Sequence, residues 1–515
     1  MKTTKLTPSL FVSSQSSSTN KIRLGQAALR RFLLAVVLLL IYAAGVRAQG
    51  TFVYANDDAF PSNTVSGFSV GANGALTQIV GSPFSTGGTG GTAGFFAANR
   101  VTVSTAGRFL YASNSLSGSV GGFSINPATG FLTPVPGSPF LVDGFGSGLG
   151  YSLAVTPNNR FLFCANDTLG TISAFTIAAN GSLASVPGSP FQLVSAIDGM
   201  KVSPDGRFLS AALPNVAVVA MLSIASNGAL AAVPGSPFPA SAGAFFPLVT
   251  GVDINCASNL LFAGIASINA PTIINVFNIA PNGALSAIAG SPFTFGGLNS
   301  NVPLLSPNGK FLFVSNQFSN GLTGSMTVLN VAANGALTQV AGSPFANPGG
   351  FFPSGIGTDA AGKFLFAAND NNTITAFSIA SNGILGPVPG SPFVTSPFGN
   401  LLSLTVYPGK SCISFDTCLK DNNTGDVFAF NSSTGAYQYT RCRDGFSISG
   451  VGTLRTVNGV LSLTDTEPDR RVSGGFLMGQ QTGRVTIMFM IGQGLWQTFT
   501  VNDTTSFGAG CTCGH

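Results

Sequence analysis

A single tetrapeptide, Gly-Ser-Pro-Phe, recurs along the chain at intervals of 47 to 56 residues. A repeat of about 20 to 50 residues indicates an architecture in which each unit is one supersecondary structure that packs against its neighbours. The copies begin at Gly81, Gly137, Gly188, Gly235, Gly290, Gly342 and Gly390. The chain must therefore build seven similar units, and this constrains its fold more than any other feature of the sequence.

One full unit, residues 152–191, contains four short runs rich in β-branched and aromatic residues: SLAVT, RFLFCAN, TISAFTI and SLASVPG. Asn-Gly or Pro-Asp-Gly turns separate the runs in most units, and such turns close tight hairpins. Four antiparallel strands that repeat about every 50 residues are typical of the blades of a β-propeller. The sequence therefore predicts an all-β fold, with a seven-bladed β-propeller over residues 49–410.

The two ends of the repeat region predict how the ring closes. Residues 51–56 (TFVYAN) match the second strand of a unit, whereas residues 401–407 match a first strand. We expect the 401–407 strand to complete the blade that begins at residue 51, which leaves no open blade edge. The Pro of each VPGSPF is expected on the fourth, outermost strand, where it removes a hydrogen-bond donor, and the Phe is expected to anchor that strand against the next blade.

Residues 411–515 contain no copy of the repeat, and their alternating runs predict a small antiparallel β domain. Five of the seven cysteines lie there, and in an exported protein they are candidates for disulfides rather than for a zinc site, because the C-x-C spacing suits zinc poorly. These candidates are Cys412, Cys418, Cys442, Cys511 and Cys513. Cys164 and Cys256 fall in non-neighbouring units, and we expect both to be buried free thiols.

Residues 1–48 are interpreted as a signal peptide with a long basic leader. The apolar stretch 32–46 is shorter than the roughly 20 residues that span a bilayer, although an uncleaved anchor is the alternative. We therefore expect a protein exported from a bacterial cell, either secreted, periplasmic or at the cell surface, without a stable membrane span. The leader holds seven of the 22 basic residues and no acidic one, so the mature chain has a net charge near −2.

Composition limits the chemistry. Only 8% of residues are charged, and Glu467 and His515 are the only glutamate and the only histidine. Most hydrolytic and metal sites use these residue types, so no metal and no cofactor are expected. The slightly acidic mature chain also lacks the basic surface that nucleic-acid binding requires. We expect a monomer that binds a small molecule, a glycan or a protein.

Several second strands share a sequence pattern that points to a family. FLYASN (109–114), FLFCAN (161–166), FLFVSN (311–316) and FLFAAN (364–369) resemble YVTN-type repeats. Over residues 50–410 the chain is thus similar to the lactonase-like seven-bladed propellers, which include 6-phosphogluconolactonase-type enzymes. The resemblance implies the propeller fold and an active site in the central channel built from acidic, basic and histidine side chains. No His or Glu lies between residues 50 and 410, so the sequence departs from that pattern.

Strands one and three of every unit begin on the same face of the ring, and this face collects candidate ligand-binding residues. Asp side chains follow the second strands, and Phe side chains stand in the Gly-rich linkers between units. Such a set suits a shallow apolar mouth rimmed by carboxylates, although Phe packing between blades and Asp capping of turns is the alternative. The candidates are Asp57, Asp58, Asp167, Asp370, Phe96, Phe246 and Phe352.

The innermost strands contribute a second group of candidates. Lys201 and Asp253 occupy one aligned position in consecutive units, and Arg100 stands two residues before that position in an earlier unit. As a catalytic set, Asp253 would act as the base, and Lys201 or Arg100 would hold a carboxylate or an oxyanion. The alternative is a structural ion pair.

These observations support two hypotheses. The first is an exported, non-catalytic propeller that binds a ligand or partner at its Phe- and Asp-rich face. It follows from a complete scaffold that lacks the His and Glu on which catalysis usually relies. The second is a lactone hydrolase of the 6-phosphogluconolactonase-like kind, which the family resemblance implies.

Overall fold

The computed structural model describes residues 50–91, 99–104, 108–142, 151–240, 246–267, 270–318, 323–395, 399, 401 and 403–409, together with eight strands beyond residue 416. The expected signal segment 1–48 and Phe96 therefore lie outside the described residues. In the described part of the chain, no helix is both long and apolar enough to cross a membrane. The helical structure found there is one 3-10 turn, Pro214–Val216.

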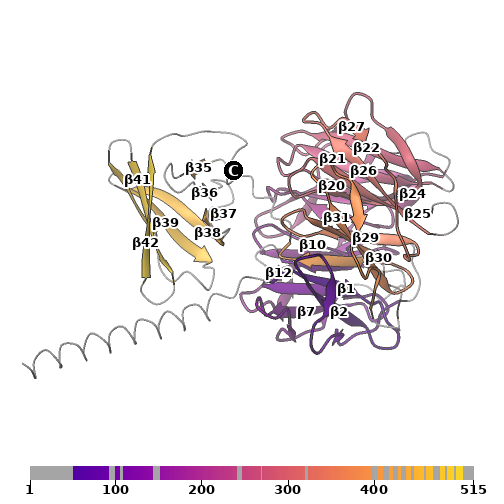
Figure 1. Ribbon diagram of the computed structural model, residues 1–515, viewed down its shortest axis with the longest axis horizontal. Coiled ribbons are helices and arrows are strands. Elements are labelled where there is room, and N and C mark those ends of the chain that lie inside the picture. The colour runs from indigo at the N-terminus through magenta and orange to yellow at the C-terminus, as the bar shows by residue number, and fades with distance from the viewer. Residues whose placement is uncertain are drawn as a thin grey trace, which may run out of the picture. The chain divides into compact units, whose positions relative to one another are not determined.

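The repeats form the blades of a seven-bladed β-propeller, which follow one another in chain order (Figure 1). Blade 1 consists of β34 (Ser403–Tyr407), β1 (Phe52–Asn56), β2 (Thr64–Val70), β3 (Leu76–Gln78) and β4 (Phe84–Ser85). Blade 2 consists of β5 (Val101–Val103), β6 (Phe109–Asn114), β7 (Ser119–Ile125), β8 (Leu132–Pro134) and β9 (Phe140–Leu141). Blade 3 consists of β10 (Tyr151–Val155), β11 (Phe161–Asn166), β12 (Thr171–Ile177), β13 (Leu183–Ser185) and β14 (Phe191–Gln192).

Blades 4 to 7 repeat this pattern. Blade 4 consists of β15 (Met200–Val202), β16 (Phe208–Leu213), β17 (Val218–Ile224), β18 (Leu230–Ala232) and β19 (Phe238–Pro239). Blades 5 and 6 consist of β20 (Leu248–Ile254), β21 (Leu260–Ala266), β22 (Pro271–Ile279), β23 (Leu285–Ala287), β24 (Phe293–Leu305), β25 (Phe311–Phe318), β26 (Ser325–Val331), β27 (Leu337–Gln339) and β28 (Phe345–Ala346). Blade 7 consists of β29 (Pro353–Thr358), β30 (Phe364–Asn369), β31 (Thr373–Ile379), β32 (Leu385–Pro387) and β33 (Phe393–Val394). The long strand β24 pairs with both β22 and β25, so it serves both blades.

The ring closes as the strand order of the sequence predicts. β34 pairs antiparallel with β1, from Phe52 opposite Tyr407 to Asn56 opposite Ser403. The last strand of the repeat region therefore becomes the innermost strand of the first blade. This pairing covers the edge of β1 that would otherwise be exposed.

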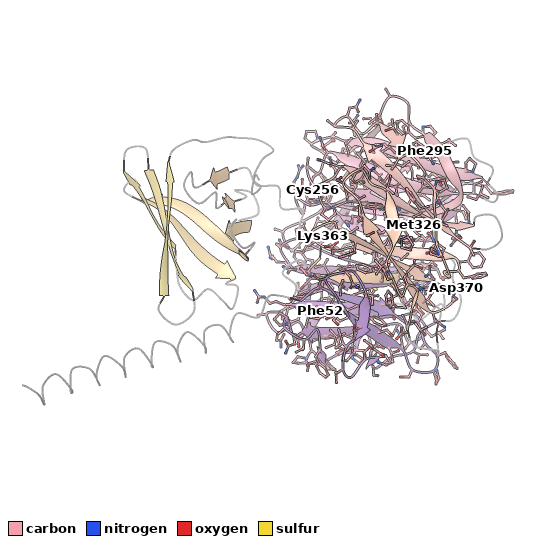
Figure 2. All side chains as sticks on the ribbon, in the orientation of Figure 1. Phe52, Cys256, Phe295, Met326, Lys363 and Asp370 are labelled. Atoms are coloured by element: carbon pink, nitrogen blue, oxygen red, sulfur yellow. The ribbon has the colours of Figure 1, made fainter. Side chains whose placement is uncertain are left out.

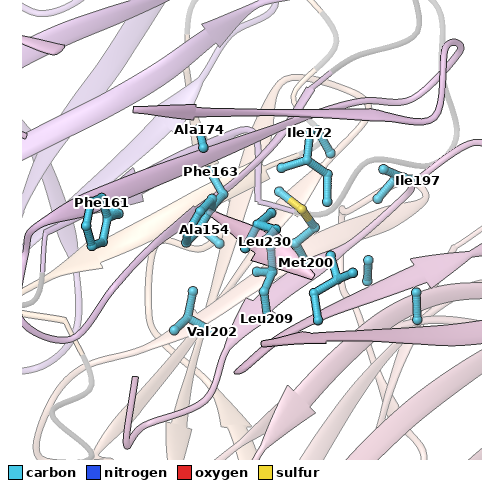
Figure 3. Close-up of a cluster of buried hydrophobic side chains, with 14 of the residues drawn as sticks. Ala154, Phe161, Phe163, Ile172, Ala174, Ile197, Met200, Val202, Leu209 and Leu230 are labelled. Atoms are coloured by element: carbon cyan, nitrogen blue, oxygen red, sulfur yellow. The ribbon is translucent and has the colours of Figure 1, made fainter. Parts of the chain in front are cut away.

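The core lies between blades, which explains why the second strands are apolar on both faces. β11 (FLFCAN) is buried along its whole length, because neighbouring blades cover both sides of it. Between blades 3 and 4, Phe161, Phe163 and Ile172 from one side meet Met200 and Leu209 from the other (Figure 3). Each fully buried side chain of this size contributes about 1.5–3 kcal/mol of transfer free energy.

The Gly-Ser-Pro-Phe repeat is a turn, which corrects the expectation that its Pro lies on a strand. In blade 3 the turn joins β13 and β14, and both of these strands pair with β12. The Oγ of Ser189 accepts the N–H of Ala174 in β12 at 2.9 Å, and all seven copies make the equivalent contact at 2.8 or 2.9 Å. The motif glycines have φ between 82° and 87°, which glycine adopts most readily.

Beyond the propeller, eight strands form one antiparallel sheet in chain order, which confirms the expected small β domain. They are β35 (Thr417–Lys420), β36 (Val427–Phe430), β37 (Ala436–Arg441), β38 (Phe446–Val457), β39 (Val460–Glu467), β40 (Phe476–Gln481), β41 (Arg484–Ile491) and β42 (Leu495–Asn502). The five cysteines expected to form disulfides here lie outside the residues whose side chains are described, so their pairing stays a prediction.

The two propeller cysteines differ from each other. Cys164 is a buried free thiol, as expected, and burial raises its pKa well above the ordinary range. Cys256 is disulfide-bonded rather than free, which corrects the expectation for that residue. It lies in the turn between β20 and β21, where it is only half-buried, so it is accessible to another cysteine in a way that Cys164 is not.

Candidate functional site

The loops after the second strands and the linkers before the first strands lie at one end of the propeller, which we call the mouth. Lys363 and Asp370 flank β30, and Figure 2 shows them on opposite sides of the propeller, with Asp370 at the mouth. Asp58 follows β1 and Arg100 precedes β5, and their side chains meet here. The Asp side chains expected at this face therefore share it with Arg100, which the sequence placed among the channel candidates.

Arg100 and Asp58 form a fully buried ion pair between blades 2 and 1. Arg100 Nη1 lies 2.6 Å from Asp58 Oδ2, and both side chains have 0% exposure. Asn56 holds the backbone of Arg100 in place, because its Nδ2 donates to Ser113 O at 2.9 Å and to Arg100 O at 3.3 Å. A buried charge without such a partner would be strongly destabilising, so the two residues depend on each other.

Two further carboxylates, from blades 3 and 4, complete a cluster around Arg100. Burial raises the pKa of Asp167 to about 6, while the charge of Arg100 opposes that rise. Asp198 is fully buried, and its pKa is raised well above the usual value, first by burial and then by the charge of Asp167, with Arg100 again opposing. We call Asp58, Arg100, Asp167 and Asp198 the mouth cluster. Four consecutive blades each contribute one member.

Asp167 differs from the other acids of the cluster in its accessibility. It is half-buried rather than fully buried, and its carboxylate accepts no hydrogen bond from any residue in the described ranges. Asp167 follows β11 directly, in the loop that leads to β12. A partly exposed carboxyl with a pKa near neutrality and a fixed positive charge nearby suits proton transfer.

The other two Asp candidates have different surroundings. Asp57 is tied to its own blade, since its Oδ2 accepts hydrogen bonds from Thr64 Oγ1 at 2.6 Å and Ser66 Oγ at 3.0 Å. Burial raises the pKa of Asp57 to about 7, against the effect of these two hydrogen bonds. Asp370 is half-buried at the mouth, and burial raises its pKa.

The channel candidates do not converge as one set. Lys201 Nζ lies 3.1 Å from Asp253 Oδ1, so these two residues form the ion pair that the sequence suggested. Arg100 instead pairs with Asp58. Asp253 Oδ2 also accepts the N–H of Leu305 in the next blade at 2.8 Å, so this carboxylate links blades 5 and 6.

The two described Phe candidates occupy strained backbone at the mouth. Phe246 has φ 50° and its side chain is 68% exposed, while Phe352 has φ 44° and packs edge-on against Phe351 with ring centroids 4.2 Å apart. A positive φ is unfavourable for a bulky side chain, and such strain collects at functional sites. Asp58 also has a positive φ, of 48°.

Sequence reasoning missed Asp198. The signal was present, because Asp198 is the only charged residue in the linker 192–199. In the described part of the chain, no group of three His, Cys, Asp or Glu side chains has a geometry that could hold a metal ion. The mouth cluster is therefore an arrangement of carboxyls around a guanidinium.

Comparisons with known proteins agree with this fold. Residues 285–400 match the family model of the lactonase, seven-bladed β-propeller. The resemblance to the lactonase-like propellers is confirmed. No curated protein sequence matches the chain.

Solved structures extend the likeness over the whole propeller. A proposed 6-phosphogluconolactonase from Bacteroides uniformis is 18% identical with a TM-score of 0.55, over 69% of this chain and 99% of that one. A proposed 6-phosphogluconolactonase from Bacteroides fragilis is 19% identical with a TM-score of 0.53, over 70% and 99%. The periplasmic gluconolactonase of Pseudomonas aeruginosa is 18% identical with a TM-score of 0.51, over 69% and 98%. At this level of identity the likeness establishes the fold alone.

Proposed function

We propose that this lactonase-like propeller hydrolyses a lactone at its mouth, with Asp167 as the general base. The observation that carries the proposal is the position of Asp167 beside the buried Arg100, where burial raises its pKa to about 6. Such a carboxyl is largely ionised at neutral pH, yet it is a better proton acceptor than an ordinary aspartate. The names of the solved relatives support the same reaction class.

The reaction needs one carboxylate and one water molecule. Asp167 removes a proton from water as the water oxygen attacks the lactone carbonyl carbon. The ester C–O bond then breaks, and the ring oxygen leaves as a hydroxyl that takes the proton back from Asp167. The product is the open-chain hydroxy acid. Arg100 contacts neither reactant in this scheme and acts through its charge, which limits the rise in the pKa of Asp167.

The test is acid release from simple lactones by the purified protein and by Asp167→Asn. We expect the variant to lose at least about a hundredfold in kcat/KM, because a general base contributes about 10²–10⁴. In the parent, kcat/KM should rise with pH through about 6, since only the ionised carboxylate accepts the proton. Asp205→Asn is the control: Asp205 lies in the turn between β15 and β16, away from the mouth, and the variant should keep the parent rate.

One observation favours a second candidate, the non-catalytic ligand-binding propeller. Arg100 has 0% exposure, so its guanidinium does not reach a ligand in this conformation. If no lactone is hydrolysed above the uncatalysed rate, hydrolysis is refuted and binding at the mouth becomes the better proposal. Activity that survives Asp167→Asn would refute the assignment of the base.

A further inference from the structure

We propose that the mouth accepts an uncharged lactone and discriminates against a phosphorylated one. This inference rests on the proposed lactone hydrolysis and adds the substrate class. Its basis is the distribution of positive charge over the propeller. Charge-assisted hydrogen bonds from a cation are the strongest contacts that a protein makes to a phosphate.

Basic residues are few in the propeller, and most of them lie at the end opposite the mouth. Residues 50–409 contain seven. Five recur at one position, at or just before the second strand of a blade, in the turn that joins it to the first strand. These are Arg108, Arg160, Arg207, Lys310 and Lys363. Figure 2 shows Lys363 on the side opposite Asp370.

The arginines of this turn also have contacts of their own. Arg160 Nη2 donates to Ser226 O at 3.1 Å, and Arg207 Nη1 donates to Pro281 O at 3.0 Å, each across to the next blade. Lys201, the sixth basic residue, lies 3.1 Å from Asp253. The turn cations therefore lie away from the mouth, and the charge of Lys201, whose side chain is 37% exposed on the innermost strand of blade 4, is compensated by Asp253.

Arg100 is the remaining basic residue, and its charge is compensated. It is fully buried and pairs with Asp58 at 2.6 Å. The linkers before the innermost strands add no positive charge, because their sequences contain no Lys or His and no Arg other than Arg100. Arg100 and Lys201 are each paired with an Asp, so no uncompensated basic residue of the propeller is left to receive a phosphate at this end.

Carboxylates, by contrast, are concentrated at the mouth. Asp57 and Asp198 are buried with raised pKa values and Asp58 is paired with Arg100, so the negative charge that a ligand meets there comes from the partly exposed Asp167 and Asp370. A phosphate monoester carries about −1.5 to −2 charges at neutral pH, and like charges brought together without a counterion repel. An uncharged polyhydroxy lactone avoids this repulsion and can still form hydrogen bonds to carboxylates.

The test compares D-glucono-1,5-lactone with its 6-phosphate as substrates of the purified protein. We expect kcat/KM for the uncharged lactone to exceed that for the phosphorylated one by at least about tenfold at low salt, and the ratio to shrink as salt screens the repulsion. A preference for the phosphorylated lactone would overturn this inference and leave the proposed hydrolysis standing. Turnover of neither lactone would overturn both.

A charge added at the mouth separates electrostatics from shape. Leu169 lies two residues after Asp167 and is 50% exposed, so Leu169→Lys adds a cation at the mouth without removing a buried contact. We expect this variant to improve the relative rate on the phosphorylated lactone by about threefold to tenfold. Ile384→Lys is the matched control, since Ile384 is 40% exposed in a hairpin at the opposite end. An unchanged ratio in Leu169→Lys, or an equal change in both variants, would contradict the proposal.

Discussion

Replacing Arg100 by methionine should destabilise the propeller, and the loss should depend on pH. The substitution keeps most of the side-chain volume but leaves Asp58 fully buried without its cation. Breaking a buried pair in this way costs about 3–5 kcal/mol. Burial already raises the pKa of Asp58, and Arg100 opposes that rise, so the variant should raise the pKa further.

The size of the pH effect follows from proton linkage. A carboxyl that stays protonated when folded must take up a proton that the unfolded chain releases above pH 3.9. This costs about 1.4 kcal/mol per pH unit, or about 4 kcal/mol at pH 7 and about 1.5 kcal/mol at pH 5. For a carboxyl whose pKa is raised by folding, this stability is fully present below the pKa of the unfolded chain and is lost as the pH rises above it. The variant should therefore recover up to about 2.7 kcal/mol relative to the parent between pH 7 and pH 5.

The assay is urea unfolding of the parent, Arg100→Met, the double variant with Asp58→Asn, and Arg207→Met, at both pH values. The double variant should recover much of the loss at pH 7, because neither charge remains buried alone. Arg207 pairs with Asp205 at 2.7 Å but is 54% exposed, so its loss should cost less than about 1 kcal/mol at either pH. The reasoning is refuted if Arg100→Met is within about 1 kcal/mol of the parent at pH 7, or if its deficit is the same at pH 5.

Two further predictions concern single contacts. Cys164 should be unreactive towards a thiol reagent in the folded protein and should react after denaturation, because it is 1% exposed and burial raises its pKa. Rapid labelling of Cys164 in the folded protein would contradict this packing. Ser189→Ala should cost about 1–2 kcal/mol in thermal or urea unfolding, because the Ala174 N–H loses its acceptor. A change below about 0.3 kcal/mol would show that the Gly-Ser-Pro-Phe serine has no such role.

The repeat allowed the fold to be predicted in unusual detail. Strand period, turn residues and a sevenfold motif are local features, and each blade depends mainly on local pairing between consecutive strands. Even the closure of β34 on β1 followed from the strand order. The Gly-Ser-Pro-Phe motif was predicted to contribute a strand Pro, but it forms a turn. The hydrogen bond that its serine accepts from the adjacent strand is not visible in a strand pattern.

The candidate site was only partly predictable. That Asp58 and Asp167 would share one face followed from strand direction. That Arg100 would join them rather than Lys201 and Asp253 did not, because a position within a strand does not indicate which neighbour a long side chain reaches. Asp198 was not predicted, because the candidates in the linkers were Phe residues and the linker 192–199 contains none.

The sequence by itself determined the number of blades, the order of their strands and the scarcity of positive charge, since these depend on periodicity and residue counts. The tertiary structure decided which charges meet. Arg100 and Asp58 are 42 residues apart, and the ring brings them into contact with each other. It also brings Asp167 of blade 3 and Asp198 of blade 4 close enough for the charge of Arg100 to affect their pKa values. It also decided the protonation of Asp167, because the pKa of a carboxyl depends on how much water and which charges surround it.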